Sequence, residues 1–316
     1  MGIIVLGAVF VDIKGYPCAQ YIPAGRNVGN VIQVHGGVSR NIAEDIGNVS
    51  LKPIFLSLVD HTGTGADVIS RLDAHGVNTS WIRRTQDGLG TWLAVFDNNG
   101  DVVASISKRP DLSEINTILK EHGDEIFSDA DSVALEIDME EDSLDLVFEL
   151  AEKYGIEVYA AVSNMSIAME RRNYLPRVGC LVCNLQEAEM FFAHSFDHHT
   201  TPELMASLER RVKVAGIRAM IVTLGEGGAI YVGPDGAGFI PAPKVDVIDT
   251  TGCGDAFFAG TVIGLTYGKT LWESCDIGTR LAGSVIATKE STCPMYLPEE
   301  FGLDPLYQKK RKAEKQ

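Results

Sequence analysis

Short apolar runs alternate with amphipathic stretches along almost the whole chain, and this alternation constrains the fold more than any other feature. Residues 2–13, 53–59 and 132–137 ("GIIVLGAVFVDI", "PIFLSLV" and "SVALEI") have the length and composition of buried strands. Residues 39–49 form one of the helical stretches, with Ser39 as the expected N-cap. Buried strands separated by amphipathic helices are typical of a layered α/β fold with a largely parallel sheet.

Two segments interrupt this alternation. Residues 90–108 contain two strand-like runs around Asn98, Asn99 and Gly100, which is a strong signal for a β-hairpin. Residues 13–34 also read as short strands and turns. We therefore expect a small β lid that closes over a site and excludes water. The predicted division is an α/β body (1–12, 35–89 and 108–305), a β lid (13–34 and 90–107) and a basic C-terminal tail (306–316).

Charge and hydropathy exclude several classes of function. The formal net charge is −16 over 316 residues, which argues against a nucleic-acid binder because such proteins need basic surface to neutralise phosphates. No apolar run reaches the roughly 18 residues of a membrane-spanning helix, and no signal peptide is recognisable, so we expect a cytoplasmic protein without membrane contact. Cys180 and Cys183 form a C-x-x-C pair, but residues three apart on a strand point to opposite faces, and no second Cys or His pair has suitable spacing. The six cysteines are therefore expected to be free thiols.

The stretch "DTTGCGDAFFAG", residues 249–260, carries the strongest chemical signal. A glycine-rich loop runs there into an apolar helix, and the N–H groups at a helix N-terminus attract anions such as phosphate. Asp255 lies in the first turn of that helix. A carboxylate beside a phosphate site makes sense as a base that takes a proton from an attacking hydroxyl. The residues alone leave a second reading open, in which Asp255 only complements the helix dipole.

The same stretch resembles the C-terminal signature of the PfkB/ribokinase family of sugar and nucleoside kinases, with Cys253 in place of the usual alanine. Residues 35–47, "HGGVSRNIAEDIG", resemble the family's N-terminal signature. The resemblance implies a ribokinase-like three-layer α/β/α domain with a mainly parallel central sheet and a small β-sheet lid. It also implies an ATP-dependent kinase that transfers the γ-phosphoryl group to a primary hydroxyl, with Mg²⁺ as cofactor and K⁺ as a further cofactor in some members.

Site residues follow from matching these motifs position by position. Asp255 would be the catalytic base, and the N–H groups of three neighbours would form the anion hole: Gly252, Cys253 and Gly254. The substrate would be held by residues of the first strand and of the N-terminal signature: Asp12, Gly36, Gly37 and Asn41. Read from the residues alone, Asp12 at the end of a buried strand could also be a turn-forming cap. Gly36 and Gly37 could likewise form a plain tight turn.

The resemblance also implies a nucleotide and metal side of the site. The residues matched to ATP binding are Asn184, Thr223, Gly225 and Gly228. Glu187, in the N-x-x-E motif of "NLQEAE", would help to organise magnesium indirectly; from the residues alone it could also be an exposed helix residue. Asp249 and Thr251 match positions that bind a monovalent cation in some members.

The most specific part of the prediction is the identity of the substrate. "GGVSRNIAEDI" resembles the pseudouridine kinase branch, so our first expectation is the 5′-hydroxyl of pseudouridine. Ribose or another sugar or nucleoside is the alternative, and a non-catalytic sugar or nucleotide sensor is the rival from another class. Two positions differ from the sequence usual in the family: Val182–Cys183 stand where Lys-Pro is common, and "YAAVSN" lacks an Asp-Pro found in many members. Both lie on the nucleotide and scaffold side of the predicted site. The expected partner is a small-molecule sugar or nucleoside, and the resemblance also points to a homodimer formed through the lid.

Overall fold

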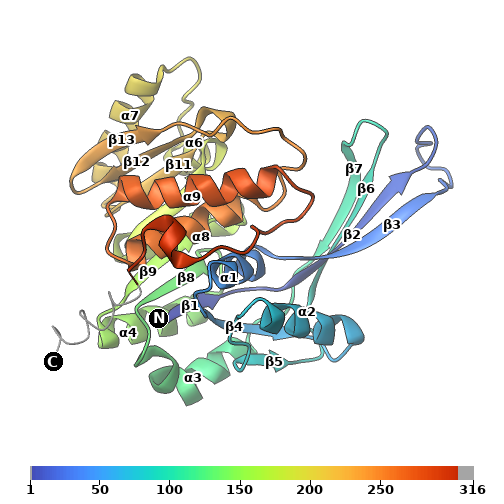
Figure 1. Ribbon diagram of the computed structural model, residues 1–316, viewed down its shortest axis with the longest axis horizontal. Coiled ribbons are helices and arrows are strands. Elements are labelled where there is room, and N and C mark those ends of the chain that lie inside the picture. Colours follow the sequence, from blue (N-terminus) through green and yellow to red (C-terminus); the bar gives the residue numbers. More distant parts are fainter. Residues whose placement is uncertain (1, 305–316) are drawn as a thin grey trace.

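A nine-stranded sheet forms the centre of the computed structural model, which describes residues 2–304 (Figure 1). Seven neighbouring strands run parallel, and two antiparallel strands extend the sheet at one edge. In spatial order the strands are β13 (Gly236–Ile240), β12 (Ala229–Gly233), β11 (Met220–Thr223), β10 (Cys180–Asn184), β9 (Glu157–Ala161), β8 (Ser132–Glu136), β1 (Ile3–Leu6), β4 (Ile54–Val59) and β5 (Ile82–Arg84).

Helices cover both faces of this sheet, so the body has three layers. Alternate side chains of β1 show why: Ile3 and Val5 join one core, whereas Ile4 and Leu6 join the other. The first core is shared with α1 (Val38–Asn48), α2 (Gly63–Ala74), α8 (Cys253–Thr266) and α9 (Leu271–Ile286). The second is shared with α3 (Glu114–Phe127), α4 (Glu141–Tyr154), α5 (Met165–Glu170), α6 (Leu185–Phe192) and α7 (Thr201–Val214). The expected three-layer α/β/α architecture is confirmed.

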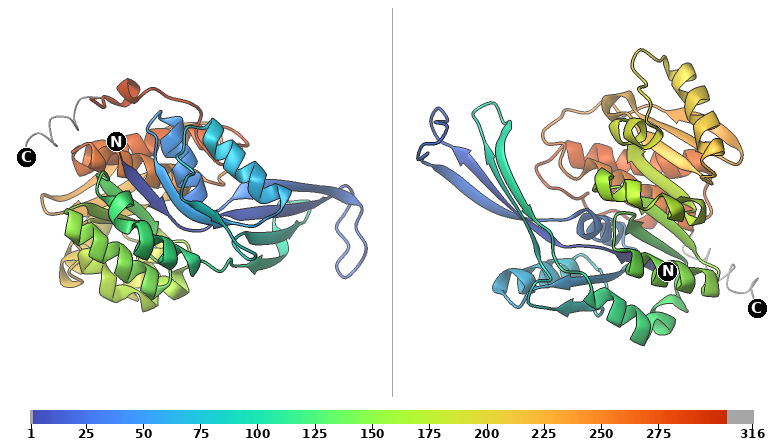
Figure 2. Two further views of the ribbon diagram at one scale, coloured as in Figure 1. Left: turned by 90° about the horizontal axis from the view of Figure 1, so that it is seen from below. Right: turned by 180° about the vertical axis from the view of Figure 1, so that it is seen from behind.

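A separate four-stranded sheet projects from the body as a long arm, which we call the lid (Figures 1 and 2). Its spatial order is β3 (Gly29–Gly36), β2 (Phe10–Pro17), β6 (Gly90–Phe96) and β7 (Val102–Lys108). β2 pairs antiparallel with β3 and parallel with β6, and β6 and β7 form the predicted hairpin. The lid is therefore built from two chain segments that both leave the body at the same end of the sheet.

The first predicted strand was wrong, because residues 2–13 form two strands in different sheets. The chain leaves the body sheet at Gly7, whose backbone has a φ of +152°, and Phe10 begins β2 opposite Gly36. Asp12 consequently lies inside the lid, opposite Val34, and not at the end of a body strand. The lid thus begins at Phe10 and not at residue 13.

The predicted N-cap of the first helix was also wrong. Gly37 precedes α1, and Ser39 lies within the helix. Its hydroxyl instead donates to the carbonyl oxygen of Leu6 at 2.8 Å. The predicted tail, 306–316, lies outside the described residues. Within residues 2–304, the helices are all too short or too polar to span a membrane.

Candidate active site

The N-terminus of α8 is the centre of the site, and a glycine makes its entry possible. Gly252 precedes the helix with a φ of +83°, and a Cβ at this position would fall on the carbonyl oxygen of Ser291. Only glycine fits both constraints. The first N–H groups of a helix have no carbonyl partner within the helix, so this end of α8 can bind an anion. One of the three expected anion-hole groups is already engaged, since the N–H of Cys253 donates to the carbonyl oxygen of Thr250 at 3.3 Å.

Asp255 lies in the first turn of α8 and is tied to the other end of the sequence. Its Oδ2 accepts a hydrogen bond of 2.7 Å from Nδ2 of Asn41, which α1 presents to it. Burial raises the pKa of Asp255 from 3.8 to about 7, and the charges of Glu136 and Asp12 add to this, while Asn41 and Arg40 oppose it. A carboxyl group with this pKa can both take up and release a proton near neutral pH.

Arg40 fixes the orientation of Asn41, and the sequence analysis missed it. The guanidinium is only 1% exposed, and its Nη1 donates to Oδ1 of Asn41 at 2.6 Å. This leaves Nδ2 of Asn41 to face Asp255. The other terminal nitrogen, Nη2, forms an ion pair with Glu44, one helical turn further along α1. The signal was present in the sequence, because Arg40 and Glu44 form an i,i+4 charge pair in a helix whose apolar positions predicted burial.

The expected substrate residues surround one large cavity beneath the lid. We call it the sugar cavity, after the role that the resemblance implies for its lining residues, and its volume is about 1030 Å³. Lid residues Lys14 and Trp92 line it together with the expected group: Asp12, Gly36, Gly37, Asn41, Asp249, Thr251 and Asp255. The carboxylate of Asp12 lies against Gly36, where a Cβ would come within 2.8 Å of its oxygens. Burial raises the pKa of Asp12, although the charges of Lys14 and Arg40 oppose the shift.

Glu136 is a second residue that the sequence analysis missed. It ends β8 and lines the sugar cavity. Its Oε1 accepts a hydrogen bond from the backbone N–H of Ser39 at 3.2 Å and lies 2.6 Å from the hydroxyl oxygen of the same residue. Burial and the neighbouring charge of Asp138 raise its pKa. A carboxylate at the carboxyl end of a parallel strand is the sequence signal that could have identified it, since ligands bind at this edge of such sheets.

A second cavity, of about 760 Å³, lies at the same helix N-terminus. We call it the nucleotide cavity. It contains Thr223, Gly225 and Gly228, which the resemblance matched to nucleotide binding, together with Cys253 and Gly254 of α8. Small side chains of α9 complete it, among them Ala282 and Gly283. Thr251 and Asp255 line the sugar cavity, and Thr250, Cys253 and Gly254 line the nucleotide cavity, so the α8 N-terminus stands between the two.

Asn184 and Glu187 lie outside the lining of these two cavities. They bond to each other in a capping box at the start of α6: each backbone N–H donates to the other's side chain at 2.8 Å. Burial raises the pKa of Glu187, and the charge of Asp138 adds to the shift. Both residues therefore stabilise the first turn of α6. Since neither lines the two cavities, they would contribute to metal binding only from outside the cavity walls.

Asp249 and Thr251 form a tight turn ahead of α8, in which the N–H of Thr251 donates to Oδ1 of Asp249 at 2.8 Å. Burial alone would raise the pKa of Asp249, but the hydrogen bonds from Thr251 and the charge of Lys14 lower it. Asp249 therefore stays ionised at the rim of the sugar cavity. Across residues 2–304, His, Cys, Asp and Glu side chains do not gather in groups of three or more that could hold a metal ion.

Comparison with known proteins agrees with this geometry. The model of the pfkB family of carbohydrate kinases matches residues 2–298. Guanosine-inosine kinase of Exiguobacterium acetylicum is 31% identical over 292 residues, covering 92% of this chain and 95% of the relative. Pseudouridine kinase of Escherichia coli is 24% identical over 264 residues and covers 82% of each chain.

Solved structures share the fold at lower identity. The ribokinase of Arabidopsis thaliana, complexed with ribose and ATP, superposes with a TM-score of 0.81 at 18% identity and covers 95% of this chain and 97% of that one. The expected fold class is thereby confirmed, as is the resemblance that predicted it. The chain belongs to the pfkB family of carbohydrate and nucleoside kinases, and is a phosphotransferase.

Proposed function

We propose that this kinase uses ATP and Mg²⁺ to phosphorylate the 5′-hydroxyl of a ribonucleoside. One observation carries the proposal: Asp255 is held by Asn41 at the helix N-terminus that separates the sugar cavity from the nucleotide cavity. A hydroxyl in the first cavity and a terminal phosphate in the second would meet at this carboxylate.

The proposed chemistry assigns a separate task to each part of the site. Asp255 accepts the proton of the attacking hydroxyl, and N–H groups of the α8 N-terminus stabilise the negative charge on the transferred phosphoryl group. Asp12 and Asn41 hold the sugar so that the hydroxyl points at Asp255. The lid covers the cavity and excludes water, which would otherwise compete as acceptor.

The chain has residues that could hold the proposed metal ions. Glu187 offers a carboxylate, and carboxylate oxygens are ligands that suit Mg²⁺. When bound, Mg²⁺ would neutralise charge on the phosphates of ATP. Asp249 and Thr251 are the proposed monovalent-cation position, supported by the ionised carboxylate of Asp249.

Guanosine and inosine are the first proposed substrates, because the relative with 31% identity over 92% of this chain is a guanosine-inosine kinase. Pseudouridine, the first expectation from the sequence, is the second candidate. It is supported by the motif "GGVSRNIAEDI" and by the pseudouridine kinase of Escherichia coli, which is 24% identical. The two candidates share the ribose and differ only in the base.

We propose a homodimer through the lid and a cytoplasmic location as secondary features. Val31 on β3 and Ile106 on β7 are 73% and 70% exposed, so the lid presents apolar surface that a second copy could cover. The six cysteines are all free, as is usual in a reducing compartment. Sedimentation of the protein against a Val31→Lys, Ile106→Lys variant would test the dimer: the variant should sediment as a monomer, and unchanged sedimentation would rule out this interface.

The test of function is ADP release by the purified protein with ATP and Mg²⁺, with and without K⁺. The panel comprises guanosine, inosine, pseudouridine, adenosine and ribose, with Asp255→Asn as the inactive control. Turnover of guanosine or inosine supports the proposal, and turnover of ribose alone would reject a nucleoside substrate. If no compound causes ADP release while one raises the melting temperature, the protein is a sensor and not a kinase for these substrates.

A further inference from the structure

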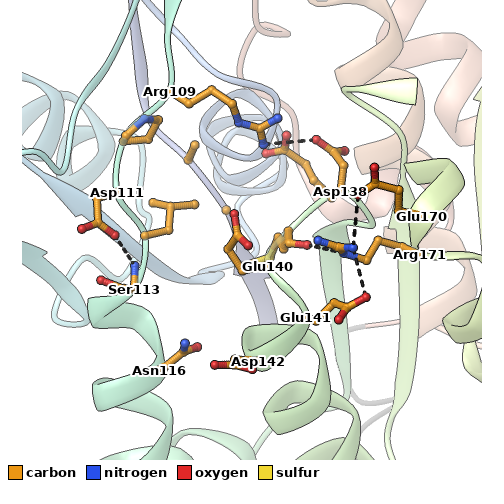
Figure 3. A pocket seen from close by; sticks show the side chains of 16 residues that line it. Arg109, Asp111, Ser113, Asn116, Asp138, Glu140, Glu141, Asp142, Glu170 and Arg171 are labelled. Atoms are coloured by element: carbon orange, nitrogen blue, oxygen red, sulfur yellow. Dashed lines mark hydrogen bonds and ion pairs between the residues drawn. The ribbon is translucent and has the colours of Figure 1, made fainter. Parts of the chain in front are cut away.

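Figure 3 shows a third cavity, which has a volume of about 740 Å³. It shares the lining residue Glu136 with the sugar cavity. We call it the Arg109 cavity. It is lined by the segment that follows β7 (109–113), the segment that follows β8 (138–142) and the turn at Gly7 and Ala8. None of the roles assigned above uses this space. Because Glu136 lines both cavities, the Arg109 cavity meets the sugar cavity at this side chain.

Arg109 is the cation in this cavity with unused hydrogen-bonding capacity. Its side chain is 46% exposed, and its only contact with another described charged group is 3.4 Å from Nη2 to Oδ2 of Asp138. Arg171, on the other side of the cavity, is held by the protein instead: its Nε donates to the carbonyl oxygen of Met139 and its Nη1 to Glu141, both at 3.1 Å. Arg109 therefore keeps N–H groups that can bind a ligand.

Two carboxylates complete the arrangement. Asp138 is buried and is fixed by the backbone N–H (3.0 Å) and hydroxyl (2.9 Å) of Ser163, so it anchors the guanidinium of Arg109 in place. Glu140 is exposed, and within the described part of the chain its carboxylate has no hydrogen-bond or ion-pair partner. Figure 3 shows its side chain among the residues around the cavity. The cavity thus offers a free donor, Arg109, and a free acceptor, Glu140.

We propose that the Arg109 cavity binds the base of the nucleoside and selects bases that carry a lactam edge, in which a ring N–H stands beside a carbonyl. This inference rests on the proposed function. With the 5′-hydroxyl at Asp255, the base is carried by C1′, which lies across the ring oxygen from C4′ and its 5′-carbon. The Arg109 cavity, which meets the sugar cavity at Glu136, is the space that we assign to the base.

The selectivity follows from hydrogen-bond chemistry. A lactam edge presents a carbonyl oxygen to Arg109 and an N–H to Glu140, as guanine, hypoxanthine and uracil all can. Arginine paired with a base carbonyl and a carboxylate paired with a base N–H are favourable combinations. Adenine presents an amino donor and an unprotonated ring nitrogen along the same edge. Both contacts would then be unfavourable, since a donor would face the cation and an acceptor would face the carboxylate.

Binding to the Asp255→Asn protein tests this inference without requiring turnover. We expect inosine to bind at least about 10-fold more tightly than adenosine, because an unpaired polar group is costly. Arg109→Met should weaken inosine binding by about 10-fold or more and leave ribose binding unchanged. Purine riboside, which has no carbonyl group, should bind equally to both proteins. Arg84→Met removes an exposed arginine that does not line the cavity, and should change none of these values.

The outcomes separate the two proposals. Equal binding of inosine and adenosine, or an equal loss of inosine and ribose binding in Arg109→Met, would overturn the base assignment. The preference for inosine without ADP release by the wild-type protein would support the base assignment and reject the proposed catalysis. Glu140→Ala provides a second variant should Arg109→Met fold poorly: it too should weaken inosine and spare ribose, and an equal effect on both would overturn the assignment.

Discussion

Replacing Asp255 by asparagine should lower turnover by orders of magnitude and, at the same time, stabilise the protein in a pH-dependent way. Asparagine keeps an oxygen that can accept the 2.7 Å hydrogen bond from Asn41 but cannot take up a proton. Loss of a general base lowers turnover by about 10²- to 10⁴-fold. Stability should change in the opposite direction, because the native environment raises the pKa of Asp255 and so disfavours its ionised form.

The size of the stabilisation follows from linkage. Burial raises the pKa of Asp255 from 3.8 to about 7, and each pKa unit corresponds to about 1.4 kcal/mol, so the upper limit is about 4 kcal/mol. Asp255 lines the sugar cavity and is only partly buried, so solvent screening reduces this limit and we expect about 1–3 kcal/mol. Protonation stabilises the wild-type protein most below pH 3.8, and this contribution is lost as the pH rises through 7. The advantage of the asparagine variant should consequently be larger at pH 8 than at pH 5.

Urea unfolding at the two pH values measures this difference directly. Asp235→Asn is the matched control, because Asp235 is an exposed turn residue and its replacement should give the same difference at both pH values. A stability difference between Asp255→Asn and wild type that does not change with pH would refute the reasoning. So would an asparagine variant that is less stable than wild type at pH 8.

Three further predictions follow from the same geometry. The kcat/KM for the nucleoside should rise with pH through about 7, since Asp255 must be ionised to act as a base, and a pH profile that is flat from 6 to 8 would contradict this. Arg40→Gln should lower kcat about 10-fold or more and move that profile, because it frees the amide of Asn41, whereas a purely structural effect would leave the profile in place. Gly252→Ala should lower the urea midpoint by an amount equivalent to about 2 kcal/mol or more, since its Cβ would fall on Ser291, and an unchanged midpoint would show that the loop can move aside.

The sequence predicted the layers of the body because they depend on local patterns. Buried strands and amphipathic helices each have a period that can be read along the chain, and β1 directs alternate residues into two cores as that period requires. The hairpin at Asn98–Gly100 was equally local. The first strand was misread because Gly7 redirects the chain between two sheets, and an apolar run by itself does not show which sheet it joins.

The site was predicted in part for the same reason. The glycine loop before α8 and Asp255 within it form a contiguous motif, whereas the bond between Asn41 and Asp255 joins residues 214 positions apart. No periodicity reveals such a contact. Glu136 was missed because its contact with Ser39 joins residues 97 positions apart, whereas Arg40 was missed although its i,i+4 pair with Glu44 is local. Asn184 and Glu187 show the opposite case: their spacing is that of a capping box, a local structure that the sequence alone could have predicted.

The central claim is that Asp255 directs phosphoryl transfer to a 5′-hydroxyl, and the position of the phosphate in the product tests it most directly. Phosphorus NMR of the reaction with inosine, ATP and Mg²⁺ should show inosine 5′-monophosphate as the only phosphorylated nucleoside, and 5′-deoxyinosine should give no product. A phosphate on the 2′- or 3′-hydroxyl, or release of inorganic phosphate in place of a nucleotide, would contradict the account.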